Sequence, residues 1–370
     1  MIQFSDPSAS YQAHKKNIDQ AIARVHNSGW FVLGGEVEAF EQEFASFHGI
    51  NYHAVGVANG TDAIALCLRS MGMGRNDEVI TASHTAVATV AGIEQAGCIP
   101  VFADIDPVTR CIEPRSIEKR ISGKTRSIMP VHIYGQPCDM NAICKIAQAY
   151  KVEVIEDCSQ AHGAEINGQK VGTFGSLAAF SCYPTKNLGG TGDGGVILCK
   201  SPQLGEKLKA LRQYGWNQNR ESIVQGFNSR LDELQAAILR VKLANLGASN
   251  KKRRIIANKY NEAFKELPMT LPHLPENELH AMHLYVIECE KRDQLINHLR
   301  RCGVGASLHY PLPVHLHTAY SNRISGSKNL PNTEAFYRRH LTLPMYPELN
   351  DHQLNLICSS VQEWFSEIKS

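Results

Sequence analysis

A lysine in a glycine-rich loop is the residue of this sequence best suited to covalent chemistry. Lys186 lies in the segment FSCYPTKNLGGTGDGG, residues 180–195, between a proline and five glycines. Pro184 restricts the backbone before the lysine, and the glycines let the backbone pass close to a ligand. Tyr183 supplies an aromatic wall, and Ser181 offers a hydroxyl to an anion. A lysine in an ordinary loop is solvated, whereas burial lowers the pKa of an enclosed lysine and makes its amine nucleophilic.

A carboxylate follows a buried apolar run in VEVIEDCSQ, residues 152–160. Asp157 stands at the end of this run, where a charge is unfavourable unless it has a polar or positive partner. A helix cap or a structural salt bridge would account for it. The alternative is an acid that keeps a heteroaromatic nitrogen protonated, so that the ring withdraws electrons.

The segment ANGTDAI, residues 58–64, joins a predicted strand to a predicted helix. Asn59 is suited to cap the helix, and Gly60 lets other groups come close to the backbone. The free N–H groups of Gly60 and Thr61 would then face outward and could bind a phosphate. Any capped strand-to-helix turn has the same pattern, so an ordinary turn stays open as the alternative.

The elements that carry these residues form two regions. Residues 52–200 alternate short apolar runs with amphipathic segments, which predicts βαβ units and a mostly parallel sheet with helices on both faces. Ligands of such sheets bind at the carboxyl ends of the strands. Beyond residue 203, long helical patterns and a strand-like HLYVIEC predict a smaller α+β domain. We therefore expect a large domain with its N-terminal segment over residues 1–247, and a small domain over residues 248–370.

The composition excludes several classes of protein. The net charge of +2 argues against a nucleic-acid partner, and the one basic run, residues 251–254, is interpreted as the solvated face of a helix. The eleven cysteines include no CxxC pair, which indicates reduced thiols in a cytoplasmic protein and gives no reason to expect a metal. No signal-peptide pattern or apolar run of membrane-spanning length occurs in the sequence, so no membrane partner is expected.

Five motifs occur together in one order: NGTDAI, PVHIYGQPCDM, VIEDCSQAHGA, SCYPTKNLGGTGDGG and NSRLDELQAA. With GWFVLGGEVEAFEQEFASFHG before them and HYPLPVHLHTAY after them, nearly the whole chain resembles the DegT/DnrJ/EryC1/StrS family of nucleotide-sugar aminotransferases. This resemblance implies an α/β fold of the fold-type I, aspartate aminotransferase-like class. It implies a mostly parallel sheet of seven strands in the large domain, and pyridoxal 5'-phosphate as the cofactor.

The resemblance also assigns roles in cofactor binding. Lys186 would hold the cofactor as a Schiff base and then act as general acid and base. Asp157 would pair with the pyridine nitrogen, and Gln160 would lie against the ring hydroxyl. The cofactor phosphate would be bound by Gly60, Thr61 and Ser181.

Other roles concern the sugar and a second subunit. Asn228, in NSRLDE, resembles the residue that the family lends to the cofactor phosphate from the neighbouring subunit, which implies a homodimer with shared sites. Tyr183, His309 and Tyr310 occupy positions that the family turns toward the sugar. For His309 and Tyr310, a packed aromatic turn beside Pro311 is the alternative.

One position departs from the family pattern. In TASHTAVATV, Ala86 stands where many relatives carry an aromatic residue that stacks on the cofactor ring. His84, two residues earlier, is the candidate to replace that aromatic residue, with structural packing as its alternative role.

The resemblance implies a transamination from L-glutamate to a nucleotide-linked keto-sugar. It favours C3 of a dTDP-linked 3-keto-6-deoxyhexose, made for a surface polysaccharide or a natural product, and leaves a 4-keto acceptor as the alternative. A sugar dehydratase with the same cofactor would replace the Schiff-base lysine, yet Lys186 is present. A regulatory protein of this family would tolerate decay of the cofactor-binding residues, whereas here the set is complete.

Overall fold

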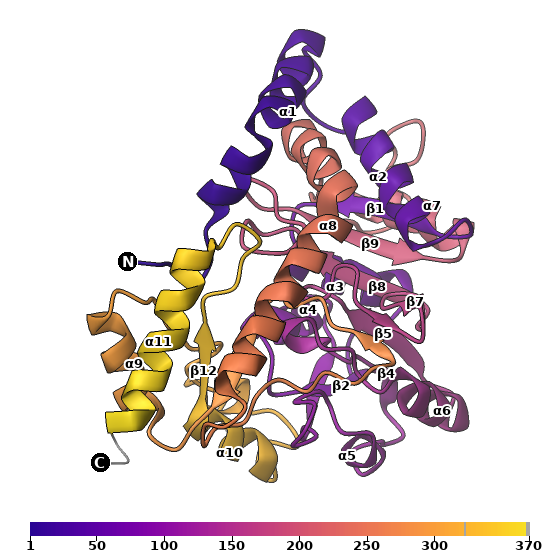
Figure 1. Ribbon diagram of the computed structural model, residues 1–370. Helices are drawn as coiled ribbons and strands as arrows, with labels where there is room; N and C mark the ends of the chain where they lie inside the picture. The colour runs from indigo at the N-terminus through magenta and orange to yellow at the C-terminus, as the bar shows by residue number, and fades with distance from the viewer. Residues whose placement is uncertain (322, 368–370) are drawn as a thin grey trace.

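A seven-stranded sheet forms the centre of the larger part of the molecule. The computed structural model describes residues 1–321 and 323–367 (Figure 1). In spatial order the strands are β1 (His53–Val57), β9 (Gly195–Cys199), β8 (Leu177–Ser181), β5 (Glu153–Asp157), β4 (Thr125–Ile128), β2 (Glu78–Ala82) and β3 (Ile99–Ala103). Strand β9 is antiparallel to β1 and β8, and the pairs from β8 to β3 are parallel. The predicted α/β fold with a mostly parallel sheet is confirmed.

Helices cover both faces of this sheet because successive side chains of a strand point to opposite sides. In β1, Val55 and Val57 belong to one apolar cluster and Ala54 to another. The first face is covered by α3 (Gly60–Ser70), α4 (Val87–Gln95) and α7 (Pro202–Leu211). The second face is covered by α2 (Gly35–His48), α5 (Pro114–Glu118), α6 (Met140–Tyr150) and the first half of α8 (Glu233–Phe264). The result is a three-layer arrangement.

Helix α8 is continuous over 32 residues and connects the two parts of the molecule (Figure 1). Its first half packs on the large sheet through Leu239 and Leu246. Its second half packs in the C-terminal core through Tyr260 and Phe264. The two helical patterns seen in the sequence are therefore one helix, and the predicted boundary at 247/248 falls inside it.

The C-terminal part is a smaller α+β unit. Its two-stranded antiparallel sheet pairs β11 (Tyr285–Glu288) with β12 (His340–Leu343). Helices α9 (Arg292–Arg301) and α11 (Asp351–Glu367) pack against this sheet, and Ile2 from the N-terminus joins the same core. Helix α10 (Pro331–Arg339) instead packs toward the large part through Phe336. The remaining elements are α1 (Pro7–Ser28), a small sheet of β10 (Glu278–Leu279), β6 (Glu165–Ile166) and β7 (Gln169–Lys170), and the 3-10 turns η1 (Ile133–Gly135) and η2 (Val314–Leu316).

The basic run 251–254 lies on α8, and the prediction that it forms a solvated face is wrong for Arg253. This side chain is buried, with a relative exposure of 5%. Its Nη1 donates to the carbonyl oxygens of Met282 and His283 at 3.3 Å and of Met345 at 2.9 Å. Because each helical residue is rotated by about 100° from the previous one, one member of a four-residue run faces the protein interior.

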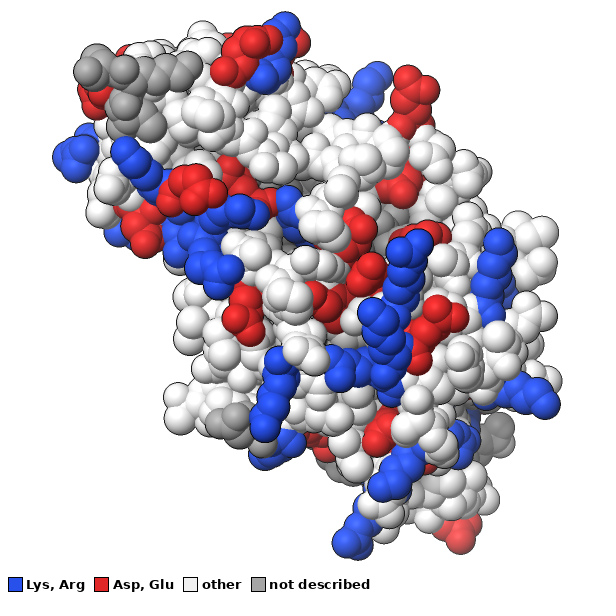
Figure 2. Space-filling view, turned by 90° about the horizontal axis from the view of Figure 1, so that it is seen from below, with Lys and Arg blue, Asp and Glu red and all other residues white. Residues whose placement is uncertain are grey.

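The surface agrees with a weakly charged protein. Figure 2 shows positive and negative side chains interspersed over the face seen from below. None of the helices in the described part of the chain combines the length and apolar character needed to cross a membrane.

Candidate active site

A pocket of about 240 Å³ lies where the strands of the large sheet end at their carboxyl termini. Nine of the residues singled out in the sequence line it together: Asn59, Gly60, Thr61, Ala86, Asp157, Gln160, Ser181, Tyr183 and Lys186. They lie at or just beyond the carboxyl ends of β1, β2, β5 and β8, including the start of α3. The parallel strand order thus brings residues that are more than a hundred positions apart into one cavity.

Lys186 lies on the tight loop that follows β8. Its backbone N–H donates to the carbonyl oxygen of Tyr183 at 2.8 Å. A Cβ on Gly189 would lie 2.5 Å from the carbonyl oxygen of Pro184, so the loop closes only with glycine there. Burial lowers the pKa of Lys186 to about 8, and the carboxylate of Asp157 opposes this decrease. A larger fraction of the amine is therefore neutral and nucleophilic near physiological pH than in a solvated lysine.

Asp157 ends β5 and is buried, with 3% relative exposure. The hydroxyl of Thr89, on α4, donates to its Oδ2 at 2.8 Å, and the backbone N–H of Ser159 donates to its Oδ1 at 3.1 Å. The Thr89 hydroxyl is itself 2.6 Å from that of Thr85. These partners hold the carboxylate in one orientation at the pocket wall, where it can pair with a positive group of a ligand.

The N-terminus of α3 forms a second wall of the pocket. The side chain of Asn59 caps the helix by accepting from the N–H of Asp62 at 2.8 Å. The first N–H groups of a helix have no partner within the helix, so those at Gly60 and Thr61 are suited to bind an anion. A Cβ on Gly60 would lie 2.6 Å from the Cβ of Ser181, which brings that hydroxyl directly beside the helix end.

The C-terminal part reaches the pocket through Gln160. The Nε2 of Gln160 donates to the hydroxyl of Tyr310 at 3.1 Å. Burial raises the pKa of Tyr310 to about 12, with a further contribution from Asp157. Burial lowers the pKa of His309 to about 4, and Lys186 adds to this decrease. His309 also packs on Phe4 and Tyr310. The segment therefore forms the packed aromatic turn considered from the sequence, and through Tyr310 it is also bonded to a residue of the pocket lining.

His84 lies in an aromatic cluster behind the pocket, while Ala86 lines the pocket itself. The imidazole contacts the rings of Phe336, Tyr134 and Tyr337 at centroid distances of 4.8, 5.3 and 5.3 Å. Its Nδ1 is 3.1 Å from the hydroxyl of Tyr337, and burial lowers its pKa well below the usual value. These contacts correspond to the packing role that the sequence left open, and the role of His84 as a replacement for the stacking aromatic receives no support from them.

Asn228 is exposed and lies on the segment before α8. Its backbone pairs with Gln213 in an isolated bridge, and its neighbour Ser229 accepts a hydrogen bond from the N–H of Ala58 at 3.1 Å. The segment is thus attached to the turn that precedes α3, while the Asn228 side chain faces solvent.

Several pocket residues were not predicted from the sequence, among them Thr89, Ser159 and Asp193. The signal for Ser159 was present, because it follows Asp157 by two residues and its N–H can reach back to that carboxylate. Thr89 lies in an apolar helical run, and only the packing of α4 against β5 brings it to Asp157.

One buried group resembles a metal site by composition. The possible ligand atoms of His132, Glu156 and Cys158 lie within 4.8 Å of one another. However, Glu156 already accepts from His132 at 3.1 Å and from three backbone N–H groups at 2.7–2.9 Å, those of residues 172, 174 and 175. The Nδ1 of His132 accepts from the N–H of Cys138 at 3.0 Å. This is the pattern of a structural hydrogen-bond network.

Comparison with known proteins agrees with this geometry. Residues 12–362 match the DegT/DnrJ/EryC1/StrS aminotransferase family. The chain is 40% identical to dTDP-3-amino-3,4,6-trideoxy-alpha-D-glucose transaminase of Streptomyces venezuelae, over 99% of this chain and 97% of the other. It is 42% identical to dTDP-3-amino-3,6-dideoxy-alpha-D-galactopyranose transaminase of Aneurinibacillus thermoaerophilus, over 98% and 99%. The crystal structure of S. venezuelae DesV superposes with a TM-score of 0.95, at 41% identity over 98% of each chain. The chain therefore belongs to the DegT/DnrJ/EryC1/StrS aminotransferase family.

Proposed function

We propose that this chain is a pyridoxal phosphate-dependent aminotransferase that transfers an amino group from L-glutamate to C3 of a dTDP-linked 3-keto-6-deoxyhexose. The observation that carries the proposal is the pocket that joins Lys186, Asp157 and the N-terminus of α3. Pyridoxal phosphate carries an aldehyde, a basic ring nitrogen and a phosphate. The amine, the carboxylate and the helix end of this pocket are the matching partners, so the residues fit the cofactor.

Each residue then has a defined task. When bound, pyridoxal phosphate supplies a ring that withdraws electrons from the carbon being deprotonated. Gly60, Thr61 and Ser181 bind the phosphate, and Asp157 keeps the ring nitrogen protonated. Lys186 would hold the cofactor through Nζ, and its free amine would act as the general acid and base that moves a proton at the donor carbon.

The sugar substrate is inferred from relatives and from the pocket mouth. Both curated relatives described above are named as transaminases of dTDP-linked 3-amino sugars. Tyr183, with 52% relative exposure, lines the pocket, and the Tyr310 hydroxyl accepts a hydrogen bond from Gln160, another residue of the pocket lining. We assign Tyr183, His309 and Tyr310 to the sugar. A 4-keto acceptor remains the second candidate, because the two ring positions differ only in which carbon is turned toward Lys186.

A homodimer completes the proposal. Asn228 faces solvent beside the turn that precedes α3. Two loops carry exposed apolar side chains, Trp30 and Phe31 on one, Ile223 and Val224 on the other. The Phe31 carbonyl accepts from the N–H of Glu233, which ties the first loop to the start of α8. Large apolar side chains exposed together favour a protein contact. A second copy of this chain is the proposed occupant, with its Asn228 reaching the phosphate of this subunit.

Absorbance spectroscopy with product analysis tests the enzyme proposal. The purified protein loaded with pyridoxal phosphate should have a visible band that disappears on addition of L-glutamate, with release of 2-oxoglutarate. Adding a dTDP-linked 3-keto-6-deoxyhexose should then restore the band and yield the amino sugar by mass spectrometry. Lys186→Ala is the control and should give neither change.

The outcomes separate the alternatives. A band that is restored only by a 4-keto sugar would assign the other carbon. Loss of a sugar hydroxyl without amine incorporation would indicate a dehydratase. A protein that neither binds the cofactor nor responds to glutamate would leave the regulatory alternative.

A further inference from the structure

Tyr134 adopts a backbone conformation that is unusual for a residue with a side chain. It lies within η1, directly after the segment that follows β4, with φ of 59° and ψ of 3°. This left-handed region is favourable for glycine and unfavourable for tyrosine. A tyrosine stays there when the surrounding contacts hold it, and such positions concentrate at functional sites.

Tyr134 is held through all three of its polar groups. Its backbone N–H donates to Oε1 of Gln160 at 2.7 Å. Its carbonyl oxygen accepts from the N–H groups of His283 at 3.0 Å and Leu284 at 3.3 Å, at the start of the C-terminal part. Its hydroxyl donates to the carbonyl oxygen of His309. One residue of the large sheet edge is therefore bonded to the pocket and to two segments of the C-terminal part.

These hydrogen bonds form a closed network that includes Gln160 of the pocket lining. Because the Tyr134 N–H occupies the amide oxygen of Gln160, the amide nitrogen of Gln160 must face the other way. That nitrogen donates to the hydroxyl of Tyr310 at 3.1 Å. The backbone then leads from Tyr310 to His309, whose carbonyl returns to the Tyr134 hydroxyl. Tyr134 therefore holds the His309–Tyr310 segment at two points, directly at the His309 carbonyl and through Gln160 at the Tyr310 hydroxyl.

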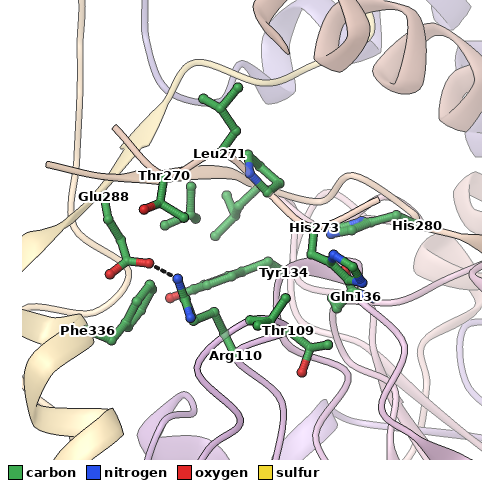
Figure 3. A pocket seen from close by; sticks show the side chains of 14 residues that line it. Thr109, Arg110, Tyr134, Gln136, Thr270, Leu271, His273, His280, Glu288 and Phe336 are labelled. Atoms are coloured by element: carbon green, nitrogen blue, oxygen red, sulfur yellow. Dashed lines mark hydrogen bonds and ion pairs between the residues drawn. The ribbon is translucent and has the colours of Figure 1, made fainter. Parts of the chain in front are cut away.

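The Tyr134 ring is enclosed on the side away from the pocket. Figure 3 shows it beside Arg110 and Phe336, with the dashed ion pair from Arg110 to Glu288 next to it. The cavity there holds about 30 Å³, room for one water molecule and not for a substrate. The imidazole of His84 packs edge-on against the ring at 5.3 Å. Burial raises the pKa of the Tyr134 hydroxyl well above its usual value, so the hydroxyl keeps the proton that it donates.

We propose that Tyr134 is a positioning residue for the sugar substrate, acting through its hydroxyl on the His309–Tyr310 segment. The inference rests on the proposed function, in which His309 and Tyr310 face the sugar. It goes further than that function because recognition of the sugar then depends on a buried hydroxyl that does not contact the substrate. Recognition of the amino donor does not depend on it.

Tyr134→Phe is the test, because it removes the hydroxyl and leaves the backbone bonds to Gln160, His283 and Leu284. Tyr260→Phe is the matched control. The Tyr260 hydroxyl is also buried and donates to a backbone carbonyl, that of Pro344 at 2.9 Å, but within the C-terminal core. Each variant thus loses one bond from a buried tyrosine hydroxyl to a backbone carbonyl of the C-terminal part.

Two readouts separate positioning from general stability. Hydrogen exchange of the peptide 305–313 should become about fivefold faster in Tyr134→Phe, because a hydrogen bond contributes about 1 kcal/mol and 1.4 kcal/mol is tenfold. In the reverse reaction of dTDP-3-amino-3,4,6-trideoxyglucose with 2-oxoglutarate, the KM for the amino sugar should rise by about the same factor. The rate and KM with L-glutamate, followed by loss of the visible band, should stay within about twofold of wild type.

The results have distinct meanings. If Tyr134→Phe matches Tyr260→Phe in both readouts, or changes glutamate and sugar kinetics equally, the positioning role is overturned. If the wild-type protein itself does not respond to glutamate, the proposed function fails. The exchange experiment still tests the bond from the Tyr134 hydroxyl to the His309 carbonyl in that case, because it needs no substrate.

Discussion

The hydroxyl of Thr89 and the carboxylate of Asp157 meet at 2.8 Å across the boundary between helix α4 and strand β5. This bond and the N–H of Ser159 occupy one side of each carboxylate oxygen and leave the rest of the carboxylate facing the pocket. The threonine thereby determines where the acid points, although it has no charge of its own.

Replacing Thr89 by valine keeps the shape and removes the hydroxyl. We expect the free energy of unfolding to fall by about 1–3 kcal/mol, since a buried charged acceptor loses a partner. Urea denaturation of the cofactor-free protein measures this loss. Thr89→Ser keeps the donor and should retain most of the stability, whereas equal losses in both variants would mean that the methyl group matters more than the hydroxyl.

Lys186 should make stability depend on pH. Burial lowers its folded-state pKa to about 8, while the unfolded chain keeps the ordinary value of 10.5. Between these values the unfolded state binds more protons, so stability rises with pH across this window. The unfavourable burial of the charge is complete below pH 8 and absent above 10.5. In the cofactor-free protein, Lys186→Met should therefore be more stable than wild type near neutral pH, and this advantage should shrink toward pH 10.

The comparison uses the urea midpoints of both proteins at each pH. Groups other than Lys186 titrate in both proteins, so their contribution cancels in the difference between the two midpoints. A difference between the two that stays constant with pH would contradict the lowered pKa.

The buried Glu156 network should behave as structure and not as a metal site. In Glu156→Gln an amide NH₂ would face backbone donors that now bond to carboxylate oxygens. We expect a loss of about 1–3 kcal/mol in the free energy of unfolding. Treatment of the wild-type protein with a chelator should leave its melting temperature unchanged. A decrease on chelation would assign a metal to His132, Glu156 and Cys158.

Mixed dimers test the shared site. Lys186→Ala and Asn228→Ala should each be inactive or strongly impaired alone. When equal amounts are unfolded and refolded together, half of the dimers are mixed and each contains one intact site, so roughly a quarter of wild-type activity should return. Activity that equals the average of the two separate variants would show that Asn228 serves its own subunit or has no role.

Much of the fold was predictable from local patterns. The alternation of β-branched runs and helical segments predicted the parallel sheet, and with it the edge where Lys186, Asp157 and Gly60 meet. The reversed direction of β9 was not predictable, because a strand's apolar pattern is the same in both directions. The continuity of α8 was also missed, since residues 229–246 and 251–267 each have a helical pattern of their own and the core they face changes between them.

Site residues could be identified from the sequence where the residue type suggests a specific chemical use. Lysine, aspartate and glycine at strand ends are such residues. His84 is not, because an imidazole two residues from a pocket position can turn toward the ligand or into the core, and in this structure it packs against Phe336. Tyr134 gave no signal of its left-handed backbone, which is set by Gln160, His283 and His309 from distant parts of the sequence.

Helix α8 has a consequence for dissecting this protein. At 32 residues it is about 48 Å long, and each half completes a different apolar core. Cutting the chain at residue 247 would leave each fragment with half a helix, an exposed apolar surface and a newly frayed end. Ile2 would also be separated from the C-terminal core in which it packs. The two parts of the chain should therefore be expressed together. New termini for a circular permutation should be placed in an exposed loop and not within this helix.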